Sequence, residues 1–318
     1  MRLVQSTALV AVLGASLSAA PALAETTLRA GVFLPPQAVF SMPFVRFADR
    51  VNAECSGLVN IEVTGPEAFN AFEQPNALKT GILDMLATPG TYYKGDMIEI
   101  DTLILGNVPM TEQRENGAWE YMNRLHNERM NAHYLTSYGD GIGFFIWTKE
   151  KSADGRFDDV RLRSSPIYET FFQSLGATTA QLPPSQIYTA LERGTVDGFG
   201  WPSWGVADFG WQEQTNYQHG PAFFNVMVGI IVNNDVWGGL SDDARACLTE
   251  QAIWMEGQWA TWLAEQNALE EDKVKAADIE YVDLGEGFTQ QAYDTYWTFL
   301  EEQSPEHVPA LRALVTKE

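Results

Sequence analysis

One arginine of this chain stands where an anion would be bound. A short strand that contains Val160 and Leu162 ends at Arg163, and a Ser-Ser-Pro turn at 164–166 leads into a helix. Free N–H groups at a helix N-terminus, the helix dipole and a guanidinium group all favour a negative charge. The spacing therefore predicts an anion site at Arg163. The alternative is a structural arginine paired with Asp158 or Asp159.

The sequence contains few of the motifs that are typical of catalytic or metal-binding sites. The segment Gly200-Trp-Pro-Ser203-Trp-Gly205 is one residue too long for a nucleophile elbow, and no glycine-rich phosphate loop follows a strand. No C-x-x-C pair is present, and the histidines lack metal-ligand spacing. Catalysis, a metal and a cofactor are therefore not expected from these patterns. The catalytic alternative, a secreted enzyme acting on aromatic acids, needs a nucleophile and a base that the sequence does not bring together.

Five ordered motifs resemble the DctP-like substrate-binding proteins of tripartite ATP-independent periplasmic (TRAP) transporters. The family patterns are E-x-x-x-A-x-x-x-G-x-x-D-M, G-x-K-x-R before an L-G-A turn, E-x-Y-x-A-L, G-x-V-D-G and V-N-x-x-x-W-x-x-L. The matching segments here begin at Glu73, Asp159 (with Leu175-Gly176-Ala177), Gln186, Gly194 and Val232. Together they cover nearly the whole mature chain, and the ordered set is specific.

The resemblance implies a fold and a function. The fold is α/β, with two lobes that enclose a ligand cleft and a long helix that braces both. The function is capture of a small organic acid for membrane-embedded TRAP permease subunits, and we expect a monomer. In the family the arginine matching Arg163 holds the ligand carboxylate in a bidentate pair, and Trp201 occupies a ligand position. A sensory receptor with the same fold is an alternative that the sequence does not separate from transport.

Departures from the family pattern narrow the expected ligand. Many members carry a second arginine near the position of Gly143-Phe144-Phe145, and asparagine where this chain has Trp201. Members that bind a divalent cation use a glutamate where this chain has Gly200. These losses disfavour C4-dicarboxylates, sialic acid and a metal. We expect a monocarboxylate with an apolar or aromatic body, with a sulfonate or an amine in an aromatic cage as alternatives.

The predicted site combines residues from both lobes. Arg163 and Trp201 are its principal candidates, while Trp204 and Trp211 are expected to pack in the core. The further candidates are aromatic or acidic side chains in segments expected to reach the cleft: Phe40, Glu73, Tyr92, Tyr93, Phe145 and Tyr188.

Bulk properties indicate the compartment. Residues 1–24 have the short apolar run and the A-x-A end of a signal peptide, so we expect a periplasmic protein. The formal net charge of −22 argues against nucleic acid as a partner. An oxidising compartment permits a disulfide between Cys55 and Cys247, and the sequence leaves open whether it forms.

The periodicity predicts the order of the elements. A strand–helix–strand–helix–strand run over 27–87 indicates a parallel sheet, and one helix is expected over 112–130. Residues 25–150 are expected mainly in the first lobe and 151–232 mainly in the second. Residues 233–318 should span both lobes, with a long helix starting at Ser241 and ending near Ala277.

Overall fold

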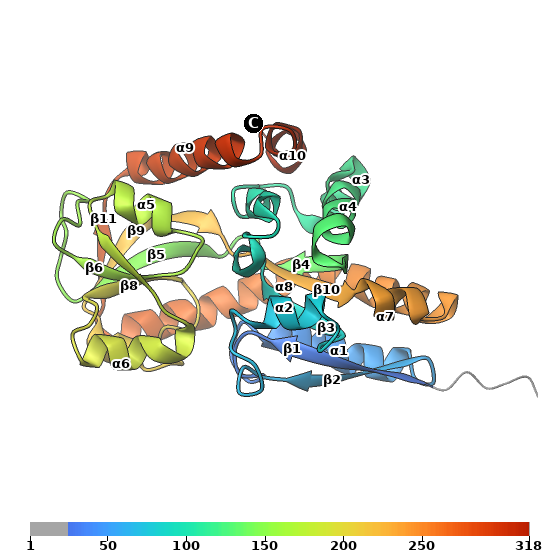
Figure 1. Ribbon diagram of the computed structural model, residues 1–318. Helices are drawn as coiled ribbons and strands as arrows, with labels where there is room; N and C mark the ends of the chain where they lie inside the picture. The colour runs from blue at the N-terminus through green and yellow to red at the C-terminus, as the bar shows by residue number, and fades with distance from the viewer. Residues whose placement is uncertain (1–24, 318) are drawn as a thin grey trace, which may run out of the picture.

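The computed structural model describes residues 25–317, so the predicted signal peptide at 1–24 lies outside the described residues. Two α/β lobes stand side by side in Figure 1, each built on its own sheet. None of the helices in the described range is both long enough and apolar enough to cross a membrane.

Lobe 1 contains a five-stranded sheet in the order β2-β1-β3-β10-β4. The three strands β1, β2 and β3 run parallel, whereas β10 is antiparallel to both of its neighbours. The predicted parallel βαβαβ run is therefore confirmed. The strands are β1 (Thr26–Val32), β2 (Val59–Thr64), β3 (Met85–Pro89), β4 (Ala132–Tyr138) and β10 (Val228–Asn233).

Lobe 2 contains a six-stranded mixed sheet in the order β11-β9-β5-β8-β6-β7. Parallel pairs join β6 to β7 and β8, while β5 is antiparallel to β8 and β9. The strands are β5 (Gly143–Thr148), β6 (Arg161–Ser164), β7 (Thr178–Gln181), β8 (Gly198–Pro202), β9 (Tyr217–Asn225) and β11 (Glu280–Asp283).

The helices cover both sheets. The α-helices are α1 (Met42–Glu54), α2 (Gln74–Lys79), α3 (Met110–Asn116), α4 (Ala118–Met130), α5 (Glu169–Ser174), α6 (Ile187–Glu192), α7 (Asn234–Gly239), α8 (Asp242–Ala276), α9 (Glu286–Gln303) and α10 (Val308–Val315). Four 3₁₀ helices are η1 (Gly90–Tyr93), η2 (Ile98–Ile104), η3 (Pro184–Gln186) and η4 (Trp211–Gln214). The prediction of a single helix over 112–130 is wrong, because Gly117, at φ 90°, separates α3 from α4.

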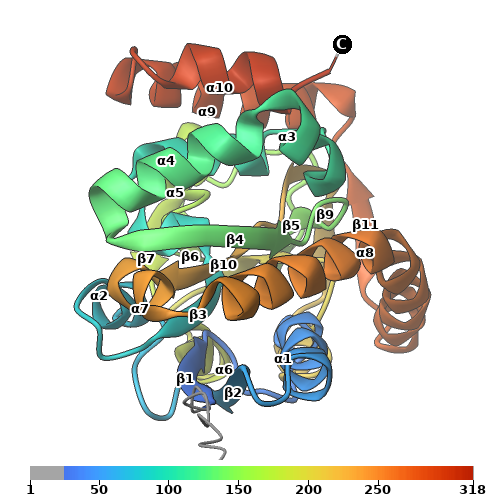
Figure 2. The same ribbon diagram turned by 90° about the vertical axis from the view of Figure 1, so that its right-hand side faces the viewer.

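The long helix α8 braces the two lobes, as the resemblance implied. The Ser241 hydroxyl caps it by accepting a hydrogen bond from the Ala244 N–H. One half of α8 packs on α1 and β4 of lobe 1, and further along Glu270 accepts a hydrogen bond from the Gly205 N–H of lobe 2. Figures 1 and 2 show α8 extending across both lobes, with α9 and α10 on the opposite side of the molecule.

A disulfide ties lobe 1 to the brace. Cys55, at the end of α1, is bonded to Cys247 in α8, with the Cα atoms 5.9 Å apart. The sequence left this pairing open because the cysteines are 192 positions apart. Packing of α1 against α8 brings them together.

The chain passes between the lobes more than once. Strand β5 joins the sheet of lobe 2 although it precedes residue 151, and β10 returns to the sheet of lobe 1 although it begins at Val228. The connections between β4 and β5 and between β9 and β10 are therefore two crossings, and α8 makes a further one. The first two fall a few residues before the limits expected from the sequence.

Candidate functional site

A cavity lies where the two lobes meet. Its volume is ≈ 470 Å³, including its opening to solvent. Lobe 1, lobe 2 and the β9–β10 crossing all contribute to its wall. The lining residues are Phe33, Phe40, Pro89, Thr91, Tyr92, Phe144, Arg163, Ser165, Ile167, Tyr168, Trp201, Pro202, Val226, Met227 and Val228.

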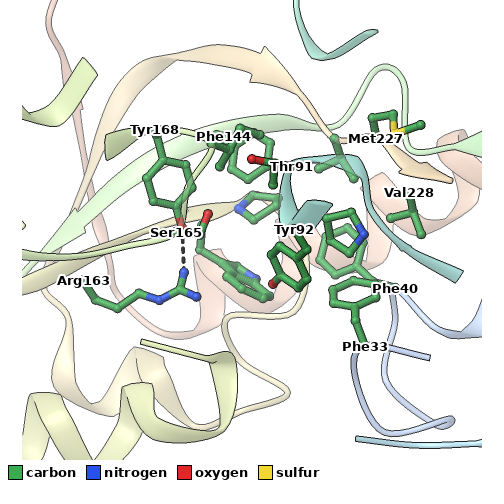
Figure 3. A pocket seen from close by; sticks show the side chains of 15 residues that line it. Phe33, Phe40, Thr91, Tyr92, Phe144, Arg163, Ser165, Tyr168, Met227 and Val228 are labelled. Atoms are coloured by element: carbon green, nitrogen blue, oxygen red, sulfur yellow. Dashed lines mark hydrogen bonds between the residues drawn. The ribbon is translucent and has the colours of Figure 1, made fainter. Parts of the chain in front are cut away.

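The cavity has a polar end and an apolar end. Figure 3 shows Arg163 and Tyr168 on one side, and Phe33, Phe40 and Val228 on the other. Among residues 25–317, Arg163 is the only charged residue in the lining. The arrangement suits a small ligand that carries one anionic group and an apolar body.

Arg163 is held firmly by lobe 2. It lies in β6, which pairs in parallel with β7 and β8, and its side chain is fully buried. Its Nε donates to the Leu182 carbonyl at 2.8 Å. Its Nη1 donates to the Tyr168 hydroxyl at 2.6 Å and to the Gly200 carbonyl at 3.3 Å. These contacts fix the plane of the guanidinium before any ligand arrives.

The remaining nitrogen of Arg163 is free. Nη2 is buried and has no hydrogen-bond partner among residues 25–317. The sequence left open that Arg163 pairs with Asp158 or Asp159. The structure does not show this pairing, because Asp158 pairs with Arg156 and Asp159 is exposed. A buried guanidinium without a counter-ion is costly. An anionic ligand in the cavity would supply the missing charge.

Trp201 forms part of the wall beside Arg163. Its indole N–H donates to the Trp204 carbonyl at 2.8 Å, which fixes the ring. The Arg163 guanidinium carbon lies 5.7 Å from the centre of that ring, within the range of a cation–π contact. Phe40 of lobe 1 meets the same ring edge-on at 6.0 Å, so aromatic side chains of both lobes meet here.

Tyr92 brings a hydroxyl from lobe 1. Burial raises the pKa of this phenol, and the positive charge of Arg163 lowers it in part. No hydrogen bond of good geometry reaches Arg163 Nη2 from the described part of the chain, but the Tyr92 hydroxyl lies close enough to the guanidinium for Arg163 to lower its pKa. Because burial is the larger effect on this pKa, the phenol stays protonated at neutral pH and available as a donor.

Four predicted site residues lie outside the cavity. Glu73 is exposed before α2, and the Tyr188 hydroxyl donates to Glu213 at 3.1 Å. Tyr93 follows Tyr92 in a 3₁₀ turn and so points elsewhere, with its hydroxyl 2.9 Å from His126 Nε2. Phe145 lies outside because side chains alternate along β5. Phe144 lines the cavity, so Phe145 faces the opposite side of the sheet.

Several lining residues were missed by the sequence analysis. Ser165 and Tyr168 follow Arg163 in the turn after β6, and this proximity is the signal that could have found them. Thr91 precedes a residue that was predicted. Phe144 and Pro202 likewise adjoin predicted residues, and Ile167 lies between Ser165 and Tyr168. The rest gave no local signal: Phe33, Pro89, Val226, Met227 and Val228.

A metal has no evident site. Among residues 25–317, no group of three or more histidine, cysteine, aspartate or glutamate side chains is placed to hold a metal ion. Gly200 occupies the position at which cation-binding members carry glutamate. A Cβ atom there would lie 2.7 Å from Tyr168 Cε2, because the Tyr168 ring fills that space.

Comparison with known proteins places this geometry in a family. A family described as "Bacterial extracellular solute-binding protein, family 7" (DctP) matches residues 33–304. An uncharacterized protein of Sinorhizobium fredii is 28% identical over 188 residues, which is 56% of this chain and 34% of that protein. The chain thus spans about a third of the length of that relative.

Two solved structures share the fold. A TRAP periplasmic solute-binding protein of Desulfovibrio salexigens, with bound orotic acid, has a TM-score of 0.81 at 15% identity, covering 92% of this chain and 97% of that one. A marine metagenome TRAP solute-binding protein in complex with pyroglutamate has a TM-score of 0.80 at 17% identity, covering 92% and 99%. The two-lobed α/β fold predicted from the sequence is confirmed.

The family match covers most of the chain and includes the strand that carries Arg163. It confirms the prediction of a binding protein rather than an enzyme. This chain belongs to family 7 of the bacterial extracellular solute-binding proteins.

Proposed function

We propose that this protein captures a compact organic monoanion, a monocarboxylate with an apolar or aromatic body, in the cavity between its lobes. The observation that carries the proposal is the buried, unpartnered Nη2 of Arg163 inside a cavity whose other walls are largely apolar. A carboxylate placed there forms a charge-assisted hydrogen bond and neutralises the guanidinium.

A single negative charge fits better than two. No lysine, histidine or second arginine lines the cavity, so a second carboxylate would be buried without a counter-charge. The space is also small. The solved structures that contain orotic acid and pyroglutamate hold small organic acids, which supports a small acid as the ligand here.

The alternatives rank below a carboxylate. An amine would have to share the cavity with Arg163, which already lies over Trp201, and no acidic side chain lines the wall to balance the amine. A sulfonate offers the same terminal oxygens as a carboxylate and is the second candidate.

Closure of the lobes would bury the ligand and strengthen its contact with Arg163. The loaded protein then delivers the ligand to membrane-embedded TRAP permease subunits. The family's extracellular character and the predicted signal peptide both support a periplasmic location. The protein acts as a monomer in this proposal.

A thermal-shift screen of carboxylates, sulfonates and amines tests the proposal. A ligand at 100 times its dissociation constant stabilises the folded state by about 2.7 kcal/mol. We expect stabilisation by small monocarboxylates and none by amines. Mass spectrometry after incubation should recover the ligand unchanged, and a chemically altered ligand would indicate an enzyme instead.

Trp201 should report on the ligand. In Trp201→Phe, most of the change in tryptophan fluorescence on addition of the best ligand from the screen should disappear. The affinity for that ligand should fall about two- to tenfold, since part of an aromatic contact of about 0.5–1.5 kcal/mol is lost. Trp262→Phe, at a tryptophan of α8 outside the cavity, is the control and should keep both. Equal behaviour of the two variants would remove Trp201 from the site.

A further inference from the structure

The three nitrogens of Arg163 are used unequally. Nε has the Leu182 carbonyl as acceptor, and Nη1 has both the Tyr168 hydroxyl and the Gly200 carbonyl. Only Nη2 lacks an acceptor. A bidentate carboxylate needs two nitrogens of the guanidinium at once, and every such pair includes Nε or Nη1. The two-nitrogen fork implied by the family resemblance is therefore not open as the side chain stands.

Tyr168 is fixed in its place over Nη1. Its hydroxyl donates to the Gly200 carbonyl at 2.6 Å and accepts from Nη1 at 2.6 Å. Its buried ring stacks on Phe172 with centroids 4.7 Å apart. The absence of a side chain at Gly200 leaves the room that this ring fills. The phenol oxygen thus stands at an acceptor position that an oxygen of a bidentate carboxylate would otherwise take.

We propose that Tyr168 is a specificity-determining residue that covers Nη1, so that the ligand anion meets Arg163 through Nη2 alone. The inference rests on the proposed function, since it concerns how the anion is held in the same cavity. It deepens that function by assigning the geometry: one anion oxygen binds Nη2, and the second oxygen must find a donor elsewhere.

Lobe 1 offers two hydroxyl groups to the cavity, those of Thr91 and Tyr92. The Tyr92 hydroxyl points toward the Arg163 side of the cavity in Figure 3, so it is the one placed to donate to an anion held there. Because Arg163 belongs to lobe 2, an anion held by both groups bridges the lobes. Covering Nη1 therefore makes tight capture depend on the presence of lobe 1, which couples binding to closure.

Two matched variants give effects of opposite sign. Tyr168→Phe keeps the ring and its stacking but frees the Nη1 hydrogen that Tyr168 now accepts, while the bond from Nη1 to the Gly200 carbonyl remains. We therefore expect this variant to bind butanoate about tenfold more tightly through one added charge-assisted hydrogen bond. Tyr92→Phe loses a hydroxyl of the same kind without freeing Nη1, and should bind butanoate roughly three- to tenfold more weakly. Isothermal titration calorimetry measures both against the unmodified protein.

The outcomes separate this inference from the proposed function. Arg163→Met should abolish butanoate binding, which shows that the probe reports on Arg163. If butanoate binds through Arg163 but Tyr168→Phe binds it equally or more weakly, Tyr168 only supports the guanidinium and the covering role is overturned. If the unmodified protein does not bind butanoate at all, the monocarboxylate proposal fails, and the role of Tyr168 fails with it.

Discussion

Arg163→Ala is expected to weaken binding of the anionic ligand about 30-fold to several thousand-fold. Truncating one partner of a desolvated, hydrogen-bonded charge pair costs roughly 2–5 kcal/mol, and about 1.4 kcal/mol corresponds to a tenfold change in affinity. The loss should be this large because Arg163 is fully buried and is the only charged residue in the cavity lining. Calorimetric titration of the best ligand from the thermal-shift screen provides the measurement.

The controls separate binding from folding. Arg163→Lys should recover only part of the affinity, because an ammonium group cannot hold the acceptors now bound by Nε and Nη1 while also reaching the ligand. Glu73→Gln, at an exposed residue outside the cavity, should bind normally. Normal binding by Arg163→Ala would refute the assignment. A loss of binding that accompanies loss of the folded circular dichroism spectrum would not support it.

Removal of the Cys55–Cys247 disulfide should lower the free energy of unfolding by about 2–5 kcal/mol. A cross-link over a long loop restricts the unfolded chain, and this bond joins residues separated by 192 positions. The double variant Cys55→Ser/Cys247→Ser, followed by urea unfolding, measures the effect. Ligand affinity should change little, because neither cysteine lines the cavity.

Reduction supplies an independent check of the disulfide. The unmodified protein with dithiothreitol should approach the stability of the double variant, and the reductant should leave the double variant itself unchanged. If the oxidised protein is no more stable than the double variant, the bond contributes nothing to stability. The brace would then depend on packing between α1 and α8 alone.

The sequence determined the fold class and singled out Arg163, the residue to which we assign the ligand's anionic group. The ordered motifs depend on local spacing, so they indicated two α/β lobes and Arg163 at the end of a strand before any tertiary contact was known. The start of α8 could also be predicted from the sequence, because the Ser241 cap acts within one helical turn. Trp201 could be placed near the site for the same reason, since it lies in β8 three residues after the motif that ends at Gly198.

Only the tertiary structure decided which side chains share the cavity. The alternation of side chains along β5 places Phe144 and Phe145 on opposite faces of the sheet. Which of these faces meets lobe 1 depends on how the lobes pack. The sequence likewise could not show that Tyr168 reaches back to Nη1, since that contact needs the space above Gly200. The pairing of Cys55 with Cys247 depends on two helices remote in the chain. Short-range preferences set each element, whereas contacts across long loops are fixed only by the packed fold.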